Sequence, residues 1–306
     1  KYYTHDAVEP FLIRLISSAT TNISSAPINC SISNIKGDAW LGTDNGLLFY
    51  NKEQNSIFHM NSSEFGINNI KIKDIAVDHL HNMWLASDSG LYFSPDHMYF
   101  WKITGISNAT SLAIDQKHNV YVGTISGLYT FKITENLSLL APNKENYNSE
   151  RTIEVPDIKI YDVNSGMPSN HVNVVKTDFN EVAWIGTNNG LVRFFNGSIS
   201  TFGIRNGMSS LKVNDIAIRN TGIRYLATSA GVDKMIGVGI EKLDFDNINS
   251  PISSSSVVES GDVKIPKFNN VKSVLWKDPN ILFIAAGYEI YQIIFSDELL
   301  DRKSVV

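Results

Sequence analysis

The chain has 306 residues, of which 43% are hydrophobic, and this is enough apolar material for a packed core. The net charge is −5, and only 26 residues are Lys or Arg, with no basic cluster among them, which argues against binding to nucleic acid or to an anionic membrane surface. The longest apolar runs, such as 281–286, are far too short to span a bilayer. Cys30 is the single cysteine, so no internal disulfide can form, and its apolar neighbours predict a buried, inert thiol.

One short phrase recurs six times along the chain. It consists of an aromatic residue in an apolar run, a small residue, a hydroxyl residue, a polar turn that ends in Gly, and a second apolar run. The clearest copy is 39–49, and the others begin near residues 83, 120, 183, 225 and 283, the last two being degenerate. Two β-branched and aromatic runs around a polar turn predict a β-hairpin, in which the Gly supplies a positive φ.

Each hairpin is flanked by further strand-like runs. One run precedes the phrase, as at 74–78, and another follows it, as at 56–59. Four antiparallel strands in a repeat of about 40 residues form the blade of a β-propeller. We therefore predict an all-β fold, a closed β-propeller of four-stranded antiparallel blades. Six blades are expected, and seven is the alternative if one copy is too worn to recognise.

The spacing of the repeats predicts where the chain carries extra residues. The aromatic anchors recur at intervals of 44, 37, 63, 41 and 58 residues, so the two long intervals hold insertions near 141–156 and 247–261. Both are polar and are expected to be exposed loops. The run 1–5 resembles the fourth strand predicted at 158–162, so we expect the N-terminal strand to complete the last blade. A ring of repeats is one cooperative unit, which predicts a single domain over 1–306.

The phrase at residues 40–47, Trp-Leu-Gly-Thr-Asp-Asn-Gly-Leu, resembles the two-component regulator propeller repeat. Segments 161–172 and 202–210 are similar to the connectors between blades in that family. The resemblance covers most of 28–235 and, weakly, 262–295. It implies a sensor-type β-propeller in the extracytoplasmic (periplasmic or extracellular) part of a receptor, which binds a ligand, often a carbohydrate, and signals through dimerisation. Kinase and DNA-binding signatures are not recognisable here, so signalling itself is not assigned to these residues.

A propeller places its hairpin turns and its connectors between blades on one face. In this chain that face would carry amides, hydroxyls and carboxylates, which suit a small polar ligand such as a sugar. The candidate ligand-binding residues are Asp44, Asn45, Asp88, His171, Asn188, Asn189, Ser229 and Glu289. A simpler interpretation also holds for each of them, because Asp and Asn favour tight turns.

No catalytic signature is legible, so we expect a non-catalytic protein without cofactor or metal. The tempting segment 78–81, Asp-His-Leu-His, aligns with turn segments of two other repeats, which predicts an exposed turn rather than a metal site. Lyase-type propellers use His and acidic residues around a metal, and here only His171 is placed on the corresponding face.

The sequence leaves a second class of function open, a structural or adhesive module. Met98 and Trp101 lie in an outer strand and could form a surface that docks a protein partner or a second copy of the chain, as a homodimer or a larger assembly. The alternative for Trp101 is packing against the neighbouring strand.

Overall fold

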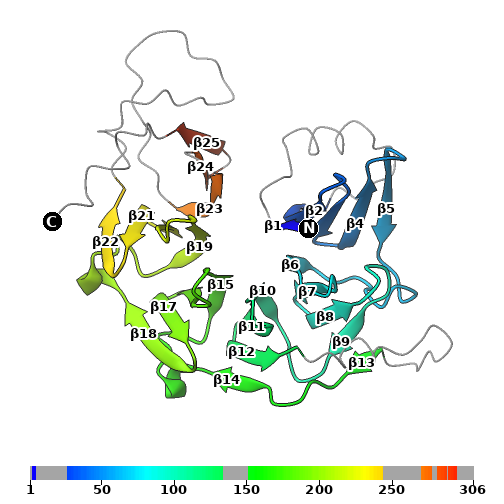
Figure 1. The fold of residues 1–306 in the computed structure, drawn as a ribbon, viewed down its shortest axis with the longest axis horizontal. Coiled ribbons are helices and arrows are strands. Elements are labelled where there is room, and N and C mark those ends of the chain that lie inside the picture. The colour runs from blue at the N-terminus through cyan, green and yellow to red at the C-terminus, as the bar shows by residue number, and fades with distance from the viewer. Residues whose placement is uncertain are drawn as a thin grey trace, which may run out of the picture. The chain divides into compact units, whose positions relative to one another are not determined.

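The computed structural model describes residues 2–4, 26–133, 151–243, 270–277, 281–287 and 289–294. Strands are the main regular structure in these residues, with two short 3-10 helices (Figure 1). They group into two compact units, Lys1–Ser165 with Asn170–Thr177 and Gly166–Ser169 with Asp178–Val306. Within the described ranges, no helix is both long and apolar enough to cross a membrane.

Six sheets are present in the described residues, and Figure 1 labels their strands. Sheet 1 has the order β1 (Tyr2–Thr4), β2 (Ile28–Asn34), β3 (Ala39–Thr43), β4 (Gly46–Asn51), β5 (Ser56–Met60). Sheet 2 has the order β6 (Ile72–Val77), β7 (Met83–Ser87), β8 (Gly90–Ser94), β9 (Trp101–Ile103), β13 (Thr152–Ile153). Sheet 3 has the order β10 (Ala109–Ile114), β11 (Asn119–Thr124), β12 (Gly127–Lys132), β14 (Lys159–Tyr161).

The remaining sheets follow the same plan. Sheet 4 has the order β15 (Val172–Thr177), β16 (Ala183–Thr187), β17 (Gly190–Phe195), β18 (Ser198–Phe202). Sheet 5 has the order β19 (Val213–Ile218), β20 (Arg224–Thr228), β21 (Gly231–Ile236), β22 (Gly239–Lys242), and sheet 6 has β23 (Val271–Lys277), β24 (Ile281–Ala286), β25 (Glu289–Ile294). The 3-10 helices η1 (Val163–Ser165) and η2 (Ile204–Asn206) lie in the connectors before β15 and β19.

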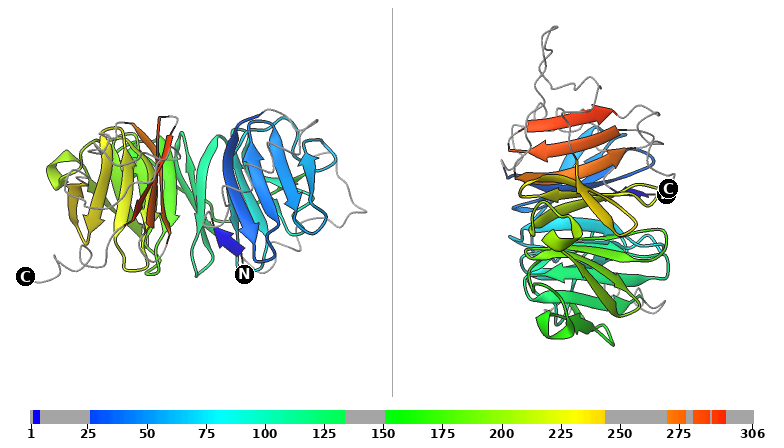
Figure 2. Two further views of the ribbon diagram at one scale, coloured as in Figure 1. Left: turned by 90° about the horizontal axis from the view of Figure 1, so that it is seen from above. Right: turned by 90° about the vertical axis from the view of Figure 1, so that its left-hand side faces the viewer.

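The predicted all-β architecture of four-stranded antiparallel sheets is confirmed. Each phrase forms a hairpin, and in sheet 1 Trp40 pairs with Phe49 while Thr43 pairs with Gly46 across the turn. All five residues of β3 are buried, as expected for a sheet covered on both faces. Strands within a sheet are twisted against one another, which Figure 2 shows. Closure into a ring and the number of blades stay predictions.

The hydroxyl residue of the phrase builds its turn. Thr43 Oγ1 donates to the carbonyl of Gly46 at 2.9 Å and accepts from the N–H of Asn45 at 3.0 Å. Thr187 makes the same pair of bonds to Gly190, at 2.8 Å, and to Asn189, at 3.0 Å. One buried hydroxyl therefore satisfies two backbone groups that the hairpin itself leaves unpaired.

A carboxylate at the opposite end of the sheet anchors the aromatic residue. Asp78 accepts the backbone N–H of Leu80 and of Asn82, each at 2.9 Å, and the indole N–H of Trp84 at 2.9 Å. Asp178 likewise accepts the indole N–H of Trp184 at 2.9 Å. In both sheets the acid lies six positions before the tryptophan. The segment 78–81 is thus a turn, as expected, and its acid has a structural partner.

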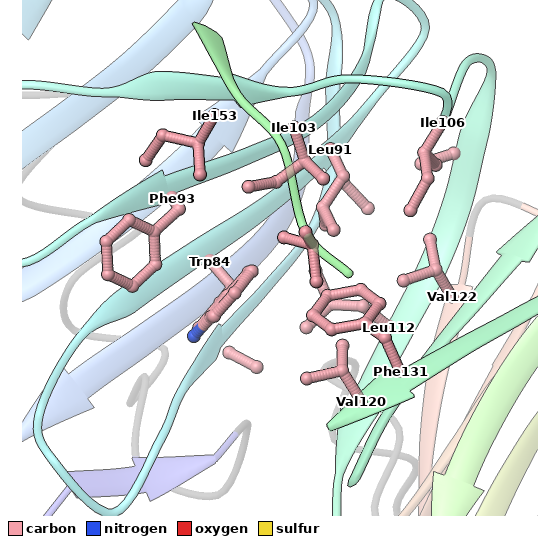
Figure 3. Close-up of a cluster of buried hydrophobic side chains, with 14 of the residues drawn as sticks. Trp84, Leu91, Phe93, Ile103, Ile106, Leu112, Val120, Val122, Phe131 and Ile153 are labelled. Atoms are coloured by element: carbon pink, nitrogen blue, oxygen red, sulfur yellow. The ribbon is translucent and has the colours of Figure 1, made fainter. Parts of the chain in front are cut away.

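Side chains from neighbouring sheets share one core. Figure 3 shows Trp84 and Phe93 of sheet 2 facing Val120 and Phe131 of sheet 3. The ring centroids of Trp84 and Phe131 lie 5.8 Å apart, and all four side chains are buried. Such aromatic contacts add to the free energy gained by removing these side chains from water.

The first strand is not where the sequence predicted it. Tyr2–Thr4 pairs antiparallel with β2, opposite Ile32–Asn34, and does not complete the last sheet. The free edge of β2 offers unpaired backbone groups, and a short run rich in Tyr and Thr satisfies them.

The end of the first predicted insertion is also not an exposed loop. Thr152–Ile153 pairs parallel with β9, and the N–H of Thr104 donates to the carbonyl of Ile153 at 2.9 Å. Ile153 and Val155 are buried in the core that sheets 2 and 3 share. Residues 141–150, and the second predicted insertion at 247–261, lie outside the described residues.

The turn hydroxyl gives a testable expectation for stability. Thr187→Val keeps the shape but leaves the buried carbonyl of Gly190 and the N–H of Asn189 without their partner. We expect the free energy of unfolding, measured by urea titration, to fall by about 1–3 kcal/mol. Thr201→Val, at an exposed position of β18, is the control and should change it by no more than about 0.5 kcal/mol. Equal losses in the two variants would show that the hydroxyl does not hold the turn.

Candidate functional site

The turn face consists of the turns of the hairpins that the repeated phrase forms, such as the turn between β3 and β4, with the connectors that lead to the next sheet. In the first unit, the connector 61–71 runs between two such turns. The N–H of Gly46 donates to the carbonyl of Ile70 at 2.8 Å, and the N–H of Asp88 donates to the carbonyl of Lys71 at 3.1 Å. The turn face of sheets 1 and 2 is therefore held together by backbone hydrogen bonds.

Asp44 lies at the centre of a charged network on this face. Its Oδ1 lies 2.7 Å from Nζ of Lys71 and accepts a hydrogen bond from the side-chain amide of Asn29 at 2.8 Å. The bond to Lys71 is the largest cause that lowers the pKa of Asp44, so this carboxyl is an ionised acceptor at neutral pH.

Asn45 and Asp88 extend the network along the connector. Asn45 Oδ1 accepts from the side-chain amide of Asn61 at 2.7 Å, and Asn61 in turn accepts from the backbone N–H of Asn69 at 2.6 Å. Asp88 is exposed, and its Oδ1 accepts from the backbone N–H of Lys71 at 3.0 Å. The structure thus brings Asp44, Asn45 and Asp88 together, and it adds Asn61, Asn69 and Lys71, which the repeated phrase did not point to.

The turn face of the second unit is held by its own connectors. Asn189 donates its side-chain amide to the carbonyl of Pro168 at 3.0 Å, and Asn188 beside it is exposed. The N–H of Ser229 donates to the carbonyl of Lys212 at 3.3 Å. These bonds leave the two Asn residues at the surface, as the sequence predicted.

The two remaining predicted residues are His171 and Glu289. His171 is half-buried and directly precedes β15 in the first unit. Glu289 begins β25, and its side chain lies outside the described residues.

Asp233 is a buried acid that sequence reasoning missed. It lies on β21 opposite Leu226, a position that Leu48 occupies in sheet 1 and Val192 in sheet 4. It is fully buried, its Oδ2 accepts from the N–H of Ser209 at 2.9 Å, and its Oδ1 has no hydrogen-bond partner among the described residues. Burial is the largest cause that raises its pKa.

Comparison of the two connectors explains the substitution. The connector Gly166-Met167-Pro168 before sheet 4 becomes Gly207-Met208-Ser209 before sheet 5. Pro168 has no N–H to donate, and sheet 4 carries the apolar Val192 at the position of Asp233. Ser209 has an N–H, and Asp233 accepts it. The sequence therefore did contain a sign of this bond: Asp233 is a charged residue where the equivalent strands are apolar, and Ser209 stands where the other connector has Pro168.

Within the described ranges, His, Cys, Asp and Glu do not gather in groups of three that could hold a metal ion. Cys30 is buried in β2, as expected, and burial is the main cause that raises the pKa of its thiol well above the usual value. A thiol in this state is a poor nucleophile.

The prediction that Trp101 forms part of an exposed partner surface with Met98 is wrong. Its side chain is only 7% exposed and packs in the core that sheets 2 and 3 share, while Met98 is 44% exposed. The outer strand β9 is covered by β13, which explains why an aromatic residue there is buried. A continuous aromatic patch is therefore absent from this strand.

Solved structures show what this fold resembles, although no protein-family model and no curated protein matches the chain. The extracellular domain of the hybrid two-component system BT3049 from B. thetaiotaomicron aligns with a TM-score of 0.66 at 16% identity, over 90% of this chain and 34% of that one. The corresponding domain of BT4673 from the same organism aligns with a TM-score of 0.61 at 15% identity, over 88% and 38%. Virginiamycin B lyase from Staphylococcus aureus aligns with a TM-score of 0.56 at 12% identity, over 90% and 97%.

These likenesses concern the fold. The chain spans about a third of the length of the two extracellular domains, and nearly the full length of the lyase. Sheets of four antiparallel strands, repeated along the chain, agree with them. The fold is that of a β-propeller, and it is similar to the fold of the extracellular domains of these two-component proteins. This agrees with the resemblance of the repeated phrase to the two-component regulator propeller repeat.

The buried acid predicts a defined pH dependence. Because the folded state raises the pKa of Asp233, its ionisation opposes folding. This cost is absent below the pKa of the unfolded state, grows as the pH rises above it, and is complete above the folded pKa. Asp233→Asn should therefore gain stability relative to the wild type as the pH rises above the ordinary carboxyl pKa of about 4, by an amount of the order of 1 kcal/mol. Urea titrations at several pH values measure the difference. A difference that is constant with pH, or equal to that of the exposed Asp157→Asn, would contradict the assignment.

Trp101 and Met98 differ in their expected effects. Trp101→Ala removes a buried indole and should lower the free energy of unfolding by about 3–5 kcal/mol. Met98→Ala, at an exposed position, should change it by no more than about 0.5 kcal/mol. Urea titration and light scattering measure stability and assembly together. If the wild type forms an oligomer and a stable Trp101→Ala variant does not, Trp101 would after all belong to a partner surface.

Proposed function

We propose that this chain is a non-catalytic sensor module whose turn face binds a small polar ligand, with carbohydrates as the first class to test. The observation that carries the proposal is the network around Asp44, Asn45 and Asp88, in which carboxylates, amides and an ammonium gather on one exposed face. Each ligand hydroxyl needs a donor and an acceptor, and this face offers both within a few ångströms.

Two further observations support the proposal. The extracellular domains of BT3049 and BT4673 share the fold, which favours a place outside the cytoplasm, in the periplasm or beyond the cell. The acids of the turn face are engaged as acceptors, since Asp44 binds Lys71 and Asp88 binds the connector. A carboxyl whose pKa is lowered is poorly suited to act as a general acid at neutral pH.

The likeness to virginiamycin B lyase makes an enzyme the alternative to test. A panel of lyase and hydrolase substrates, assayed on the wild type and on His171→Ala, addresses it. Turnover that is lost in this variant would replace the sensor proposal by an enzymatic one.

Binding itself is tested by a glycan array and a metabolite screen, followed by calorimetry on the best ligand. In the first unit, Asp44→Asn with Asn45→Ala removes a charge and an acceptor, and we expect the affinity to fall about tenfold or more. Glu53→Gln, at the exposed turn on the other end of β4, removes the same charge and should leave the affinity unchanged.

The second unit is tested separately with Asn188→Ala and Asn189→Ala, two exposed positions of its own turn face. Loss of affinity in this variant alone would move the site to the second unit. If no ligand binds, or if none of these variants changes the affinity, the proposal fails.

A further inference from the structure

The strands β2, β6, β10, β19 and β23, each of which pairs with the first strand of a hairpin, carry one bulged residue. In three of them the side chain of that residue has the same task. In sheet 1 the strand β2 is irregular between Ile28 and Cys30, and the bulged residue is Asn29. Its amide donates to Asp44 in the turn of its own sheet at 2.8 Å and to the carbonyl of Ile72 in the next sheet at 3.0 Å. One side chain thus binds both its own turn and the neighbouring sheet.

The same bond to the next sheet recurs at other bulges. Thr110 donates its hydroxyl to the carbonyl of Val172 at 2.7 Å, and Asn214 donates its amide to the carbonyl of Val271 at 2.7 Å. The bulges themselves are conserved in geometry, with register shifts at β10 and β19. In these three sheets a short neutral donor at the bulge joins two sheets, whereas sheets 2 and 6 carry Lys73 and Lys272 at the bulge.

Lys73 is the bulged residue of sheet 2, and it makes neither bond. The strand β6 is irregular between Ile72 and Asp74, which places Lys73 in the position of Asn29. Among the described residues, its ammonium has no hydrogen bond and no ion pair. Asp88, the acid of its own turn, instead accepts from the backbone N–H of Lys71, and Nζ of Lys71 binds Asp44.

The surroundings of Lys73 favour an incoming anion. The side chain is half-buried, and loss of water around the ammonium is the main cause that lowers its pKa, whereas Asp88 acts in the opposite direction. A partly desolvated cation without a fixed partner is stabilised when a charged acceptor arrives. Lys71, whose ammonium is paired with Asp44, is a second cation nearby and also lowers the pKa of Lys73.

We propose that Lys73 binds the acidic group of the ligand on the turn face, so that the ligand of this protein is a small polar acid, with a carboxylate or a phosphate, rather than a neutral sugar. This inference rests on the proposed function and adds the charge of the ligand to it. Asp88 binds the connector through Oδ1, and its Oδ2, which has no hydrogen bond among the described residues, accepts from a ligand hydroxyl beside the acidic group.

Calorimetry with four probes tests the inference: glucuronate, glucose 6-phosphate, glucose and inorganic phosphate. We expect at least one of the two acidic sugars to bind about tenfold or more tightly than glucose, the value of one charge-assisted hydrogen bond, and the preference to weaken as salt is added. Lys73→Gln should abolish the preference, so that the acidic sugars and glucose bind with about the same affinity. Lys132→Gln, an exposed lysine at the other end of sheet 3, changes the net charge equally and should leave the preference intact. Urea titration of both variants confirms that they are folded.

The possible results separate the inference from the function beneath it. If glucose binds as tightly as the acidic sugars, or if Lys73→Gln keeps the preference, the inference is overturned while the sensor function stands. If Lys132→Gln lowers the preference as much as Lys73→Gln, the effect is one of net charge, and the inference is also overturned. Binding of glucuronate but not of glucose 6-phosphate selects a carboxylate ligand, and the reverse selects a phosphate. If inorganic phosphate alone binds, or if no probe binds, the inference is overturned, while the sensor function is decided by the glycan array and the metabolite screen.

Discussion

Close approach of neighbouring sheets is the constraint on which the rest of this fold depends. A Cβ at Gly42 would lie 2.6 Å from Cγ2 of Ile72, and one at Gly123 would lie 2.5 Å from Cγ1 of Val172, both in the next sheet. No larger side chain fits at these positions without moving the neighbouring strand. The small residue of each phrase therefore sets the distance between sheets, and the short hydrogen bonds from bulged residues such as Asn29 become possible only at that distance.

Polar groups in these interfaces follow from the same proximity. Asp74 accepts from the hydroxyl of Ser111 at 2.8 Å and from the N–H of Leu112 at 2.9 Å, both on the next sheet. Ser111 in turn accepts from the N–H of Val175 at 3.1 Å, so the first strands of three sheets are linked in series. Asp215 and Ser273 repeat the pair in the second unit. These acids are satisfied both by a neighbouring sheet and by their own strand, since Asp74 also accepts from the N–H of Ile75 at 3.0 Å and Asp215 from that of Ile216 at 2.8 Å.

Local features could be predicted from the sequence, and long-range ones could not. The hairpins, their Gly turns and the buried anchors follow from residue patterns within a dozen positions, and all appear. The pairing of Tyr2–Thr4 depends instead on which sheet edge is free, and the burial of Trp101 depends on coverage by Thr152–Ile153, some fifty positions away. No pattern inside either segment carries that information.

The candidate site shows the same division. Turn residues such as Asp44 and Asp88 could be placed on one face from the repeat alone, because every copy puts its turn at the same end of the sheet. Their partners could not, since Lys71 and Asn61 lie in a connector that has no repeated phrase. The tie between Asp78 and Trp84 had a readable spacing, which repeats at Asp178 and Trp184, but its chemical meaning appears only when the indole N–H is seen to be buried.

The hydrogen bond from the N–H of Ser209 to Asp233 is absent from the equivalent pair, Pro168 and Val192, because proline has no N–H. This difference has a consequence for how such a chain can grow by duplication. A connector and the third strand of the sheet that follows it must suit each other, because the N–H of one is bound by the side chain of the other. A copied segment cut at the boundary between sheets would separate these partners and leave a buried donor or acid without its complement. Connectors also bind the turn of the sheet before them, as the carbonyl of Ile70 accepts from the N–H of Gly46, so a cut on either side of a connector carries a penalty.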